Sequence, residues 1–539
     1  MNVPIFAALC RRVSPNPFRI WLLLGVVLLA APLHVAQASA LLRKYIILEN
    51  ALTHVDEAAA ALKGGSVQER TKDLPHLIVL WTPSAGTREA PTSAEVYLGY
   101  RGSSSPVPAQ VKIDVSGDHF TGEVTIPSAN GYQGGGWRFS GPLAASGGRG
   151  EFTTLGTGWQ RQGRTQVWTV FDNGRLWMSR AWVPPGPEPV RGIFIFGNGL
   201  GNDERIAVID DWWLTFCRLH RFALVATAFY GSADAATLQN QISEVGSATG
   251  HPELDRAPVL FTGHSNGGEM AWEYNAAHPN RVIAFTVSKG GFYPTTHIDA
   301  TARHNPAILI IGENDTSVRI NAIMGLFAAN RPDNAPWALA VEPNIAHGFG
   351  RTAHLWLPFL EWAVQTRLPC APAAPGDGSS PAKLAIIDPA TGFVVARRAL
   401  KEGEKSIMPA ASFKGALGES SWLPNEMLAM AFLAFNTPKS DLDLTMEPAS
   451  GVLHANDRLR LGIARFDPHA WKQVRLLVNG RVVASLSPEK PEVTIGVSRP
   501  GIFCAVAVGV PSAGGPERLA GPLSWIVGPS DISNDIPRR

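Results

Sequence analysis

The residues best suited to chemistry lie around Ser265, in the motif Gly263-His-Ser-Asn-Gly267. An apolar run, 258–262, precedes the motif, and a helix-forming run, 268–277, follows it. A G-x-S-x-G motif between a strand and a helix places its serine at the apex of a sharp turn, with the hydroxyl exposed above the sheet. The glycines let the two backbones pass close together, and the start of the helix favours developing negative charge. We therefore predict that Ser265 is a nucleophile; the alternative is a glycine-rich turn with an unused serine.

A serine hydroxyl becomes reactive only when a base accepts its proton and a third group orients that base. After a G-x-S-x-G turn of this kind, the acid comes next along the chain and the histidine follows it. Asp315 comes shortly after the apolar run 307–311, and His347 lies in a glycine-containing loop after the run 337–341. We predict that Asp315 is the acid, with Glu313 as the alternative, and that His347 is the base.

The same chemistry needs two donors that stabilise the oxyanion of the intermediate. The backbone amide of Asn266, directly after the serine, is the expected first donor. The second is expected from the glycine-rich loop 196–202, where we assign Leu200, with Gly199 as the alternative. We expect His264 to point away from the serine and to be structural.

The segment that contains these residues has the pattern of an α/β fold. Apolar runs alternate with helical patterns, which predicts a doubly wound, mostly parallel sheet with helices on both faces. Two adjoining strands, 165–171 and 175–183, come first. The further strands are expected at 191–196, 222–229, 258–262, 282–287, 307–311 and 337–341, and the helices at 203–220 with Asn202 or Asp203 as its cap, 235–248, 268–277, and 357–366 with Pro358 in its first turn.

The rest of the 539 residues is expected to form accessory segments. Short alternating runs separated by Gly, Ser and Pro predict a β-rich domain, before which 45–62 could form one helix. A Pro- and Gly-rich linker follows the α/β unit. Beyond it come a mixed segment and a run of short strands typical of a β-sandwich. The predicted ranges are 1–40 for a signal peptide, 41–163 for the β-rich domain, 164–370 for the α/β unit, 371–383 for the linker, 384–450 for the α+β segment and 451–528 for the sandwich.

The first forty residues have the three parts of a secretory signal. Arg11, Arg12 and Arg19 precede the apolar run 20–31, and small residues follow at 36–40. This order predicts cleavage after about Ala40 and a secreted or periplasmic protein with no stable membrane span. An uncleaved membrane anchor is the alternative.

Cysteine usage and charge limit the other possibilities. Cys217, Cys370 and Cys504 remain after cleavage, so at most one disulfide can form, and the sequence does not indicate which pair. No His and Cys residues have metal-ligand spacing, and we expect neither a metal nor another cofactor. The net charge of +2 gives no indication of a nucleic-acid partner.

Residues 166–368 resemble the α/β-hydrolase superfamily. The Gly-His-Ser-Asn-Gly-Gly turn, with Ala-Ala-His-Pro-Asn-Arg-Val at 276–282, looks most like secreted polyhydroxyalkanoate-depolymerase and feruloyl or acetyl-xylan esterase branches. The run 474–485 resembles bacterial immunoglobulin-like modules. The superfamily resemblance implies a triad of Ser265, Asp315 and His347 and hydrolysis of esters through an acyl-enzyme. Asn198 stands where histidine is commoner, which does not remove a backbone donor.

These observations predict a secreted serine esterase that acts on a small or polymeric ester, such as one linked to plant-wall polysaccharide. The gap between the expected strands near 287 and 307 leaves little room for a lid, which favours an open cleft. A serine peptidase of the same fold is the first alternative, because it would use the same acyl chemistry. A binding protein with an inactive hydrolase fold is the second. The sequence does not indicate the ester, the role of the β segments or the oligomeric state.

Overall fold

The computed structural model divides into two compact units, which we describe separately. The first comprises residues 1–157, 171–177 and 201–203, and the second comprises 158–170, 178–200 and 204–539. The structure describes residues 44–49, 73–82, 93–100, 110–126, 135–144, 147–154, 160–161, 167–171, 178–197, 199, 207–208, 210–228, 235–368, 383–397, 407–438, 442–464 and 466–529. The predicted signal peptide, 1–40, and the predicted linker, 371–383, lie outside these residues apart from residue 383.

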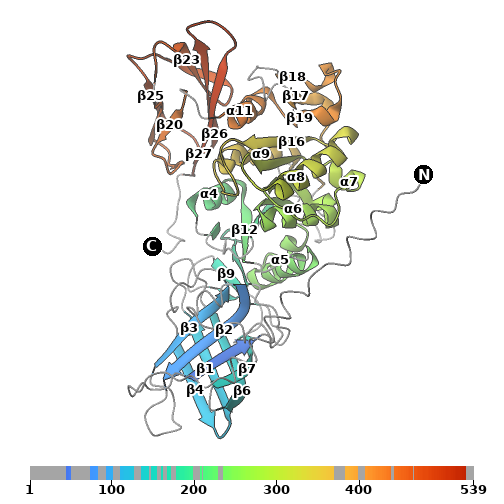
Figure 1. The fold of residues 1–539 in the computed structure, drawn as a ribbon, viewed down its shortest axis with the longest axis vertical. Helices are drawn as coiled ribbons and strands as arrows, with labels where there is room; N and C mark the ends of the chain where they lie inside the picture. The colour runs from blue at the N-terminus through green and yellow to red at the C-terminus, as the bar shows by residue number, and fades with distance from the viewer. Residues whose placement is uncertain are drawn as a thin grey trace, which may run out of the picture. The chain divides into compact units, whose positions relative to one another are not determined.

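The first unit contains one seven-stranded sheet with the order β3-β2-β1-β7-β6-β5-β4 (Figure 1). All neighbouring strands are antiparallel except β1 and β7, which are parallel. The β-rich prediction is confirmed, but the helix expected at 45–62 is wrong at its start, because Lys44–Glu49 pairs with strands on both sides. The strands are β1 Lys44–Glu49, β2 Asp73–Thr82, β3 Ser93–Tyr100, β4 Gln110–Ser116, β5 His119–Ile126, β6 Gly135–Ala144 and β7 Gly147–Thr154.

The second unit is built on a nine-stranded sheet with the order β16-β15-β14-β13-β11-β12-β10-β9-β8. The six strands from β16 to β12 are parallel, and β10 joins them antiparallel. This is the doubly wound, mostly parallel α/β-hydrolase sheet that the sequence predicts. The strands are β8 Gln160–Arg161, β9 Val167–Phe171, β10 Met178–Trp182, β11 Gly192–Gly197, β12 Phe222–Ala228, β13 Val259–His264, β14 Val282–Ser288, β15 Ala307–Gly312 and β16 Trp337–Glu342.

Helices cover both faces of this sheet because alternate side chains of each strand point to opposite faces. Phe194 and Phe196 of β11 contact Trp213 on one face, at ring distances of 5.3 and 5.2 Å. On the other face, Phe261 of β13 contacts Tyr274 at 5.7 Å. The parallel strands are therefore buried on both sides. The helices are α4 Asp211–His220, α5 Ala235–Thr249, α6 Asn266–Ala277, α7 Ala300–Arg303, α8 Ser317–Asn330 and α9 Thr352–Arg367.

Two of these helices differ from the prediction at their starts. Helix α4 begins at Asp211 and not near 203, because the side chain of Asp210 accepts hydrogen bonds from the amides of Trp212 and Trp213 and caps the helix there. Helix α9 begins at Thr352, so Pro358 lies inside the helix and not in its first turn. The Pro358 ring cannot donate to the carbonyl of His354, four residues earlier. The Ser524 hydroxyl donates to that carbonyl instead, at 2.7 Å.

The C-terminal residues pack as part of the same compact unit. A three-stranded sheet, β18-β17-β19, precedes helix α11, which is capped by Asn425 and buried from 428 to 436. Residues 384–388 form no strand, and β17 pairs with β18 and β19. The elements are β17 Phe393–Ala396, β18 Ile407–Pro409, β19 Ser420–Leu423 and α11 Glu426–Asn436.

Two further sheets, β20-β22-β25 and β21-β27-β26-β23-β24, share a hydrophobic core that includes Leu459, Val474 and Trp525. A β-rich C-terminal region is thus confirmed. Its likeness to immunoglobulin modules and the predicted domain boundaries stay predictions. The strands are β20 Leu444–Glu447, β21 Val452–Leu453, β22 Arg458–Ile463, β23 Trp471–Val478, β24 Arg481–Leu486, β25 Glu492–Gly496, β26 Gly501–Pro511 and β27 Arg518–Val527.

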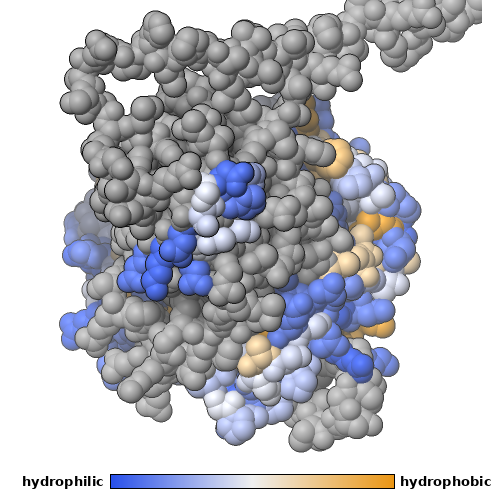
Figure 2. Space-filling model, turned by 90° about the horizontal axis from the view of Figure 1, so that it is seen from below, coloured by the Kyte–Doolittle hydropathy of each residue, from blue (hydrophilic) through white to orange (hydrophobic). Residues whose placement is uncertain are grey.

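The surface of the described residues is mainly hydrophilic on the face drawn in Figure 2, with hydrophobic side chains in small patches. Among the described helices, none is long and apolar enough to cross a membrane.

Candidate active site

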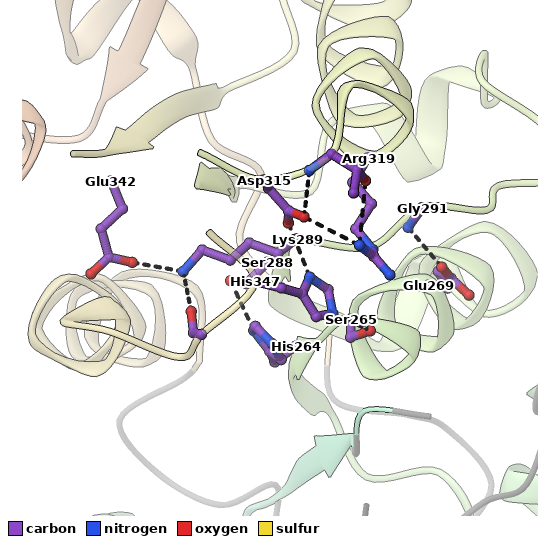
Figure 3. Close-up of polar contacts among 12 residues, drawn as sticks. His264, Ser265, Glu269, Ser288, Lys289, Gly291, Asp315, Arg319, Glu342 and His347 are labelled. Carbon is purple, nitrogen blue, oxygen red and sulfur yellow. Dashed lines mark hydrogen bonds and ion pairs between the residues drawn. The ribbon is translucent and has the colours of Figure 1, made fainter. Parts of the chain in front are cut away.

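Ser265 lies in the one-residue turn between β13 and α6 (Figure 3). Its φ of 55° and ψ of −124° are strained for a residue with a side chain. A Cβ atom on Gly263 would lie 1.9 Å from the carbonyl oxygen of Gly267, so this position requires glycine. The amide of Ser265 donates to the carbonyl of Ser288, at the end of β14, at 2.6 Å. The Ser265 hydroxyl does not cap α6 and is left to bond elsewhere.

The structure brings together the three residues that the sequence analysis singled out. His347 Nε2 lies 2.9 Å from Ser265 Oγ, and His347 Nδ1 lies 3.0 Å from Asp315 Oδ2. Asp315 follows β15, and His347 follows β16, so all three side chains come from the carboxyl ends of parallel strands. With the proton on Nδ1, His347 donates to Asp315, and its Nε2 is free to accept the serine proton.

The Asp315 carboxylate is 2% exposed, yet it is held in the charged form. Burial alone would raise its pKa, but hydrogen bonds from His347, the Thr316 amide at 2.7 Å and Arg319 at 3.2 Å outweigh that effect and lower the pKa. A charged Asp315 can stabilise a protonated His347. Glu313, the alternative acid, accepts a hydrogen bond from the Asn344 amide at 2.8 Å.

His264 lies beside the base rather than away from the site. Its ring centroid is 5.0 Å from that of His347, and its Nδ1 atom lies 3.5 Å from Ser288 Oγ (Figure 3). Burial, with the nearby Lys289 and His347, lowers the pKa of His264 to about 4, so the ring is neutral at pH 7. The motif reveals a histidine before the serine, but nothing in it indicates contact with a residue so far along the chain.

The structure describes one of the two predicted oxyanion donors, Asn266. Asn266 begins α6, is buried, and has a side-chain Nδ2 atom with no hydrogen-bond partner. Leu200 lies outside the described residues, whereas Gly199 is described and buried. A Cβ atom on Gly197 would lie 2.9 Å from the Cα of Gly267, so the end of β11 passes directly against the serine turn. The loop after β11 therefore starts beside the site.

Charged residues that the sequence analysis did not single out also surround the site. Lys289 and Glu342 form a buried ion pair of 2.7 Å, and Arg319 bonds to Asp315. In sequence they look like ordinary surface charges, because nothing local indicates burial. Cys217 and Cys504 are free and buried, while Cys370 lies outside the described residues. In the part of the chain that the structure describes, no group of three or more His, Cys, Asp or Glu could hold a metal ion.

One family model and several solved structures are similar to part of this chain. Residues 223–355 match the model of the Dienelactone hydrolase family. No curated protein matches the sequence. Solved structures similar to part of this chain include poly(aspartic acid) hydrolase-1 from Sphingomonas sp. KT-1, at 15% identity, a TM-score of 0.27, and coverage of 36% of this chain and 95% of that one. Another is the acetyl xylan esterase from Aspergillus awamori, at 15% identity, a TM-score of 0.27, and coverage of 35% and 98%.

The matched range contains Ser265, Asp315 and His347, and it runs from β12 into α9. The structural likenesses extend over little more than a third of this chain and indicate no substrate. The sheet order and the family match over residues 223–355 together indicate an α/β-hydrolase fold for the second unit.

Proposed function

We propose that this protein is a secreted serine hydrolase that cleaves carboxylic esters through an acyl-enzyme on Ser265. The observation that carries the proposal is the continuous contact from Ser265 Oγ through His347 to Asp315, with distances of 2.9 and 3.0 Å. Nucleophile, base and orienting acid are thus within hydrogen-bond reach of one another, which is the geometry that activates a serine hydroxyl.

In the first step, Ser265 Oγ attacks the ester carbonyl carbon while His347 Nε2 accepts the hydroxyl proton. The carbonyl oxygen gains negative charge, which the amides of Asn266 and Leu200 stabilise. The tetrahedral intermediate then collapses. His347 gives its proton to the leaving alkoxide, and the alcohol departs, leaving the acyl group on Ser265.

In the second step, water attacks the acyl carbon while His347 accepts a proton from it. Collapse of this second intermediate returns the proton to Ser265 Oγ and releases the carboxylic acid. Asp315 stays ionised throughout and stabilises the imidazolium that forms in each step.

Two exposed apolar side chains support a bulky or polymeric ester as substrate. Phe292 is 65% exposed and Val318 is 68% exposed, and they follow the ends of β14 and β15, the strands that lead to the site. The amides of Gly291 and Phe292 both donate to Glu269 at 2.8 Å, which fixes the segment that carries the aromatic ring. An apolar acyl or alcohol group of the substrate could pack against Phe292 and Val318.

Labelling with a fluorophosphonate probe tests the nucleophile. Wild-type protein should be labelled, and Ser265→Ala should abolish both the labelling and the hydrolysis of p-nitrophenyl acetate. Wild-type protein that is not labelled would favour the binding-protein alternative. A panel of feruloyl, acetyl-xylan and polyhydroxybutyrate esters beside peptide amides then separates the esterase from the peptidase. Export is tested by the mass of the mature chain, which should begin after about residue 40.

A further inference from the structure

The ammonium group of Lys289 is buried against the loop that carries His347. Lys289 follows the last residue of β14 and has no exposed surface. Its Nζ atom donates to Glu342 Oε2 at 2.7 Å and to the backbone carbonyl of Gly348 at 2.6 Å (Figure 3). The ammonium thus joins the end of one strand to the residue directly after His347.

Glu342 holds the same loop at its two ends. It is the last residue of β16, so the loop 343–351 starts from it. Its Oε1 atom accepts a hydrogen bond from the backbone amide of Arg351, and Thr352 Oγ1 donates to its Oε2 atom at 3.4 Å. One carboxylate therefore fixes where the loop leaves the sheet and where α9 begins, and Lys289 fixes the middle.

The backbone at Lys289 indicates that the side chain itself is needed. Its φ is 55°, in the left-handed region that glycine adopts without strain. A side chain in this region carries a conformational cost, and the two residues that follow are both glycine. Burial also lowers the pKa of the ammonium, against the favourable effect of Glu342. Both costs would be avoided by glycine, which could not reach Glu342 or Gly348.

The neighbouring residue links this pair to the nucleophile. The Ser288 carbonyl accepts the hydrogen bond from the Ser265 amide, and the Lys289 amide donates to the Ile310 carbonyl at 2.9 Å. Two consecutive residues at the end of β14 therefore hold the serine turn and the histidine loop. A shift of either changes the distance between Ser265 Oγ and His347 Nε2.

We propose that Lys289 and Glu342 are positioning residues that hold His347 within reach of Ser265. The proposal rests on the function proposed above, since it assigns His347 as the base. A buried ion pair is by itself weak evidence for stability, because its desolvation can cost as much as its attraction gains. The position of this pair around the His347 loop gives it a role in the site.

The test compares Lys289→Met, Glu342→Gln and the double variant, which removes both charges and leaves an oxygen for the Arg351 amide. We expect kcat for p-nitrophenyl acetate to fall about 10- to 100-fold in the double variant with KM within about threefold, because a base displaced by about 1 Å loses about that much rate. Fluorophosphonate labelling should slow by the same factor. Deuterium exchange of the peptide 343–351 should become faster.

Arg331→Met is the matched control. Arg331 is also buried, and it donates to the carbonyls of Ser420 and Ala335, away from the triad. It should lower thermal stability yet leave kcat per folded molecule and exchange of 343–351 unchanged. A double variant with wild-type kcat and wild-type exchange in this peptide would overturn the proposal.

The remaining outcomes are also decisive. If the double variant does not fold, Glu342→Gln decides, since it preserves side-chain shape; unchanged kcat and exchange in it count against the proposal. If wild-type protein is not labelled by the fluorophosphonate, the proposed function fails. The exchange of 343–351 then still shows whether the pair holds the loop.

Discussion

The turn that carries Ser265 and the loop that carries His347 meet at one site, but they are held in different ways. The turn is fixed by backbone: β13 on one side, α6 on the other, and a glycine whose replacement would collide with a carbonyl 1.9 Å away. The loop 343–351 has no helix or strand. One backbone bond, from the Asn314 amide to the Ile345 carbonyl, holds it at 2.9 Å. The side chains of Lys289, Glu342 and Arg351 hold the rest of the loop.

The partners of the loop are also far away in sequence. Arg351 Nη1 donates to the Gly521 carbonyl at 2.9 Å, and its Nη2 donates to the Phe435 carbonyl at 3.0 Å. The C-terminal sheets and α11 therefore hold the point where α9 begins. The serine turn is held by β13, α6 and the Ser288 carbonyl, whereas the base depends in addition on segments near residues 435 and 521. Changes to the C-terminal region should consequently affect the base before they affect the nucleophile.

The largest expected effect on the rate distinguishes Asp315 from Glu313 as the acid that orients His347. Asp315→Asn should lower kcat for p-nitrophenyl acetate by about 10⁴-fold, because the amide favours the wrong tautomer of His347. Glu313→Gln is the control and should stay within about threefold, since Glu313 bonds to the Asn344 amide instead. Steady-state kinetics of the two variants decides. A larger loss in Glu313→Gln would reverse the assignment.

A pair of glycines tests how tightly the loop is packed. A Cβ atom on Gly350, whose φ is +59°, would lie 2.1 Å from Glu342 Oε1, whereas one on Gly348 would meet nothing within 4 Å. We expect Gly350→Ala to cost about 2–5 kcal/mol of unfolding free energy, from backbone strain and overpacking. Gly348→Ala should stay within about 0.5 kcal/mol. Urea denaturation measures both, and equal losses would show that the loop adapts.

The same contrast explains how much the sequence could reveal. The hydrolase strands are predictable because burial on both faces leaves continuous apolar runs, and the serine turn is predictable because its constraints are local. Lys289 is not, because a buried lysine and an exposed one look alike in sequence. The start of α9 is not predictable either, because Pro358 suggests a first turn unless the distant Ser524 is known. Residues 45–49 show the converse, an apolar run whose strand neighbours override a helical interpretation.

Acid should weaken the attachment of α9 to the C-terminal sheet. Burial, with the nearby Arg351, lowers the pKa of His354 from 6.5 to about 4. Below pH 6.5 the unfolded chain binds a proton that the folded chain does not, so stability is complete above pH 6.5 and is lost as pH falls toward 4. The loss should be on the order of 2–3 kcal/mol for this residue.

His354→Asn provides the comparison for that loss. In the wild-type protein, His354 Nδ1 accepts a hydrogen bond from the Ser524 amide at 3.0 Å. The side-chain oxygen of asparagine can still accept that bond, but asparagine does not titrate. The fall in stability between pH 6.5 and 4 should therefore be smaller in the variant, as measured by urea denaturation at several pH values. Asp315 does not add to this fall in stability. Its pKa is lowered in the folded state, so the stability that it contributes is lost as pH falls below its ordinary pKa of 3.8. An unchanged pH dependence would contradict the prediction.

The smallest effect tests the contact that makes Pro358 tolerable. Ser524→Ala removes the hydroxyl that donates to the His354 carbonyl, which Pro358 cannot satisfy, so we expect a loss of about 1–2 kcal/mol. In a Pro358→Ala background the helix supplies its own amide to that carbonyl. The same serine substitution should then cost less, by about 1 kcal/mol in a double-mutant cycle. Additive losses would mean that the two residues act independently, and that α9 is held by Arg351 rather than by Ser524.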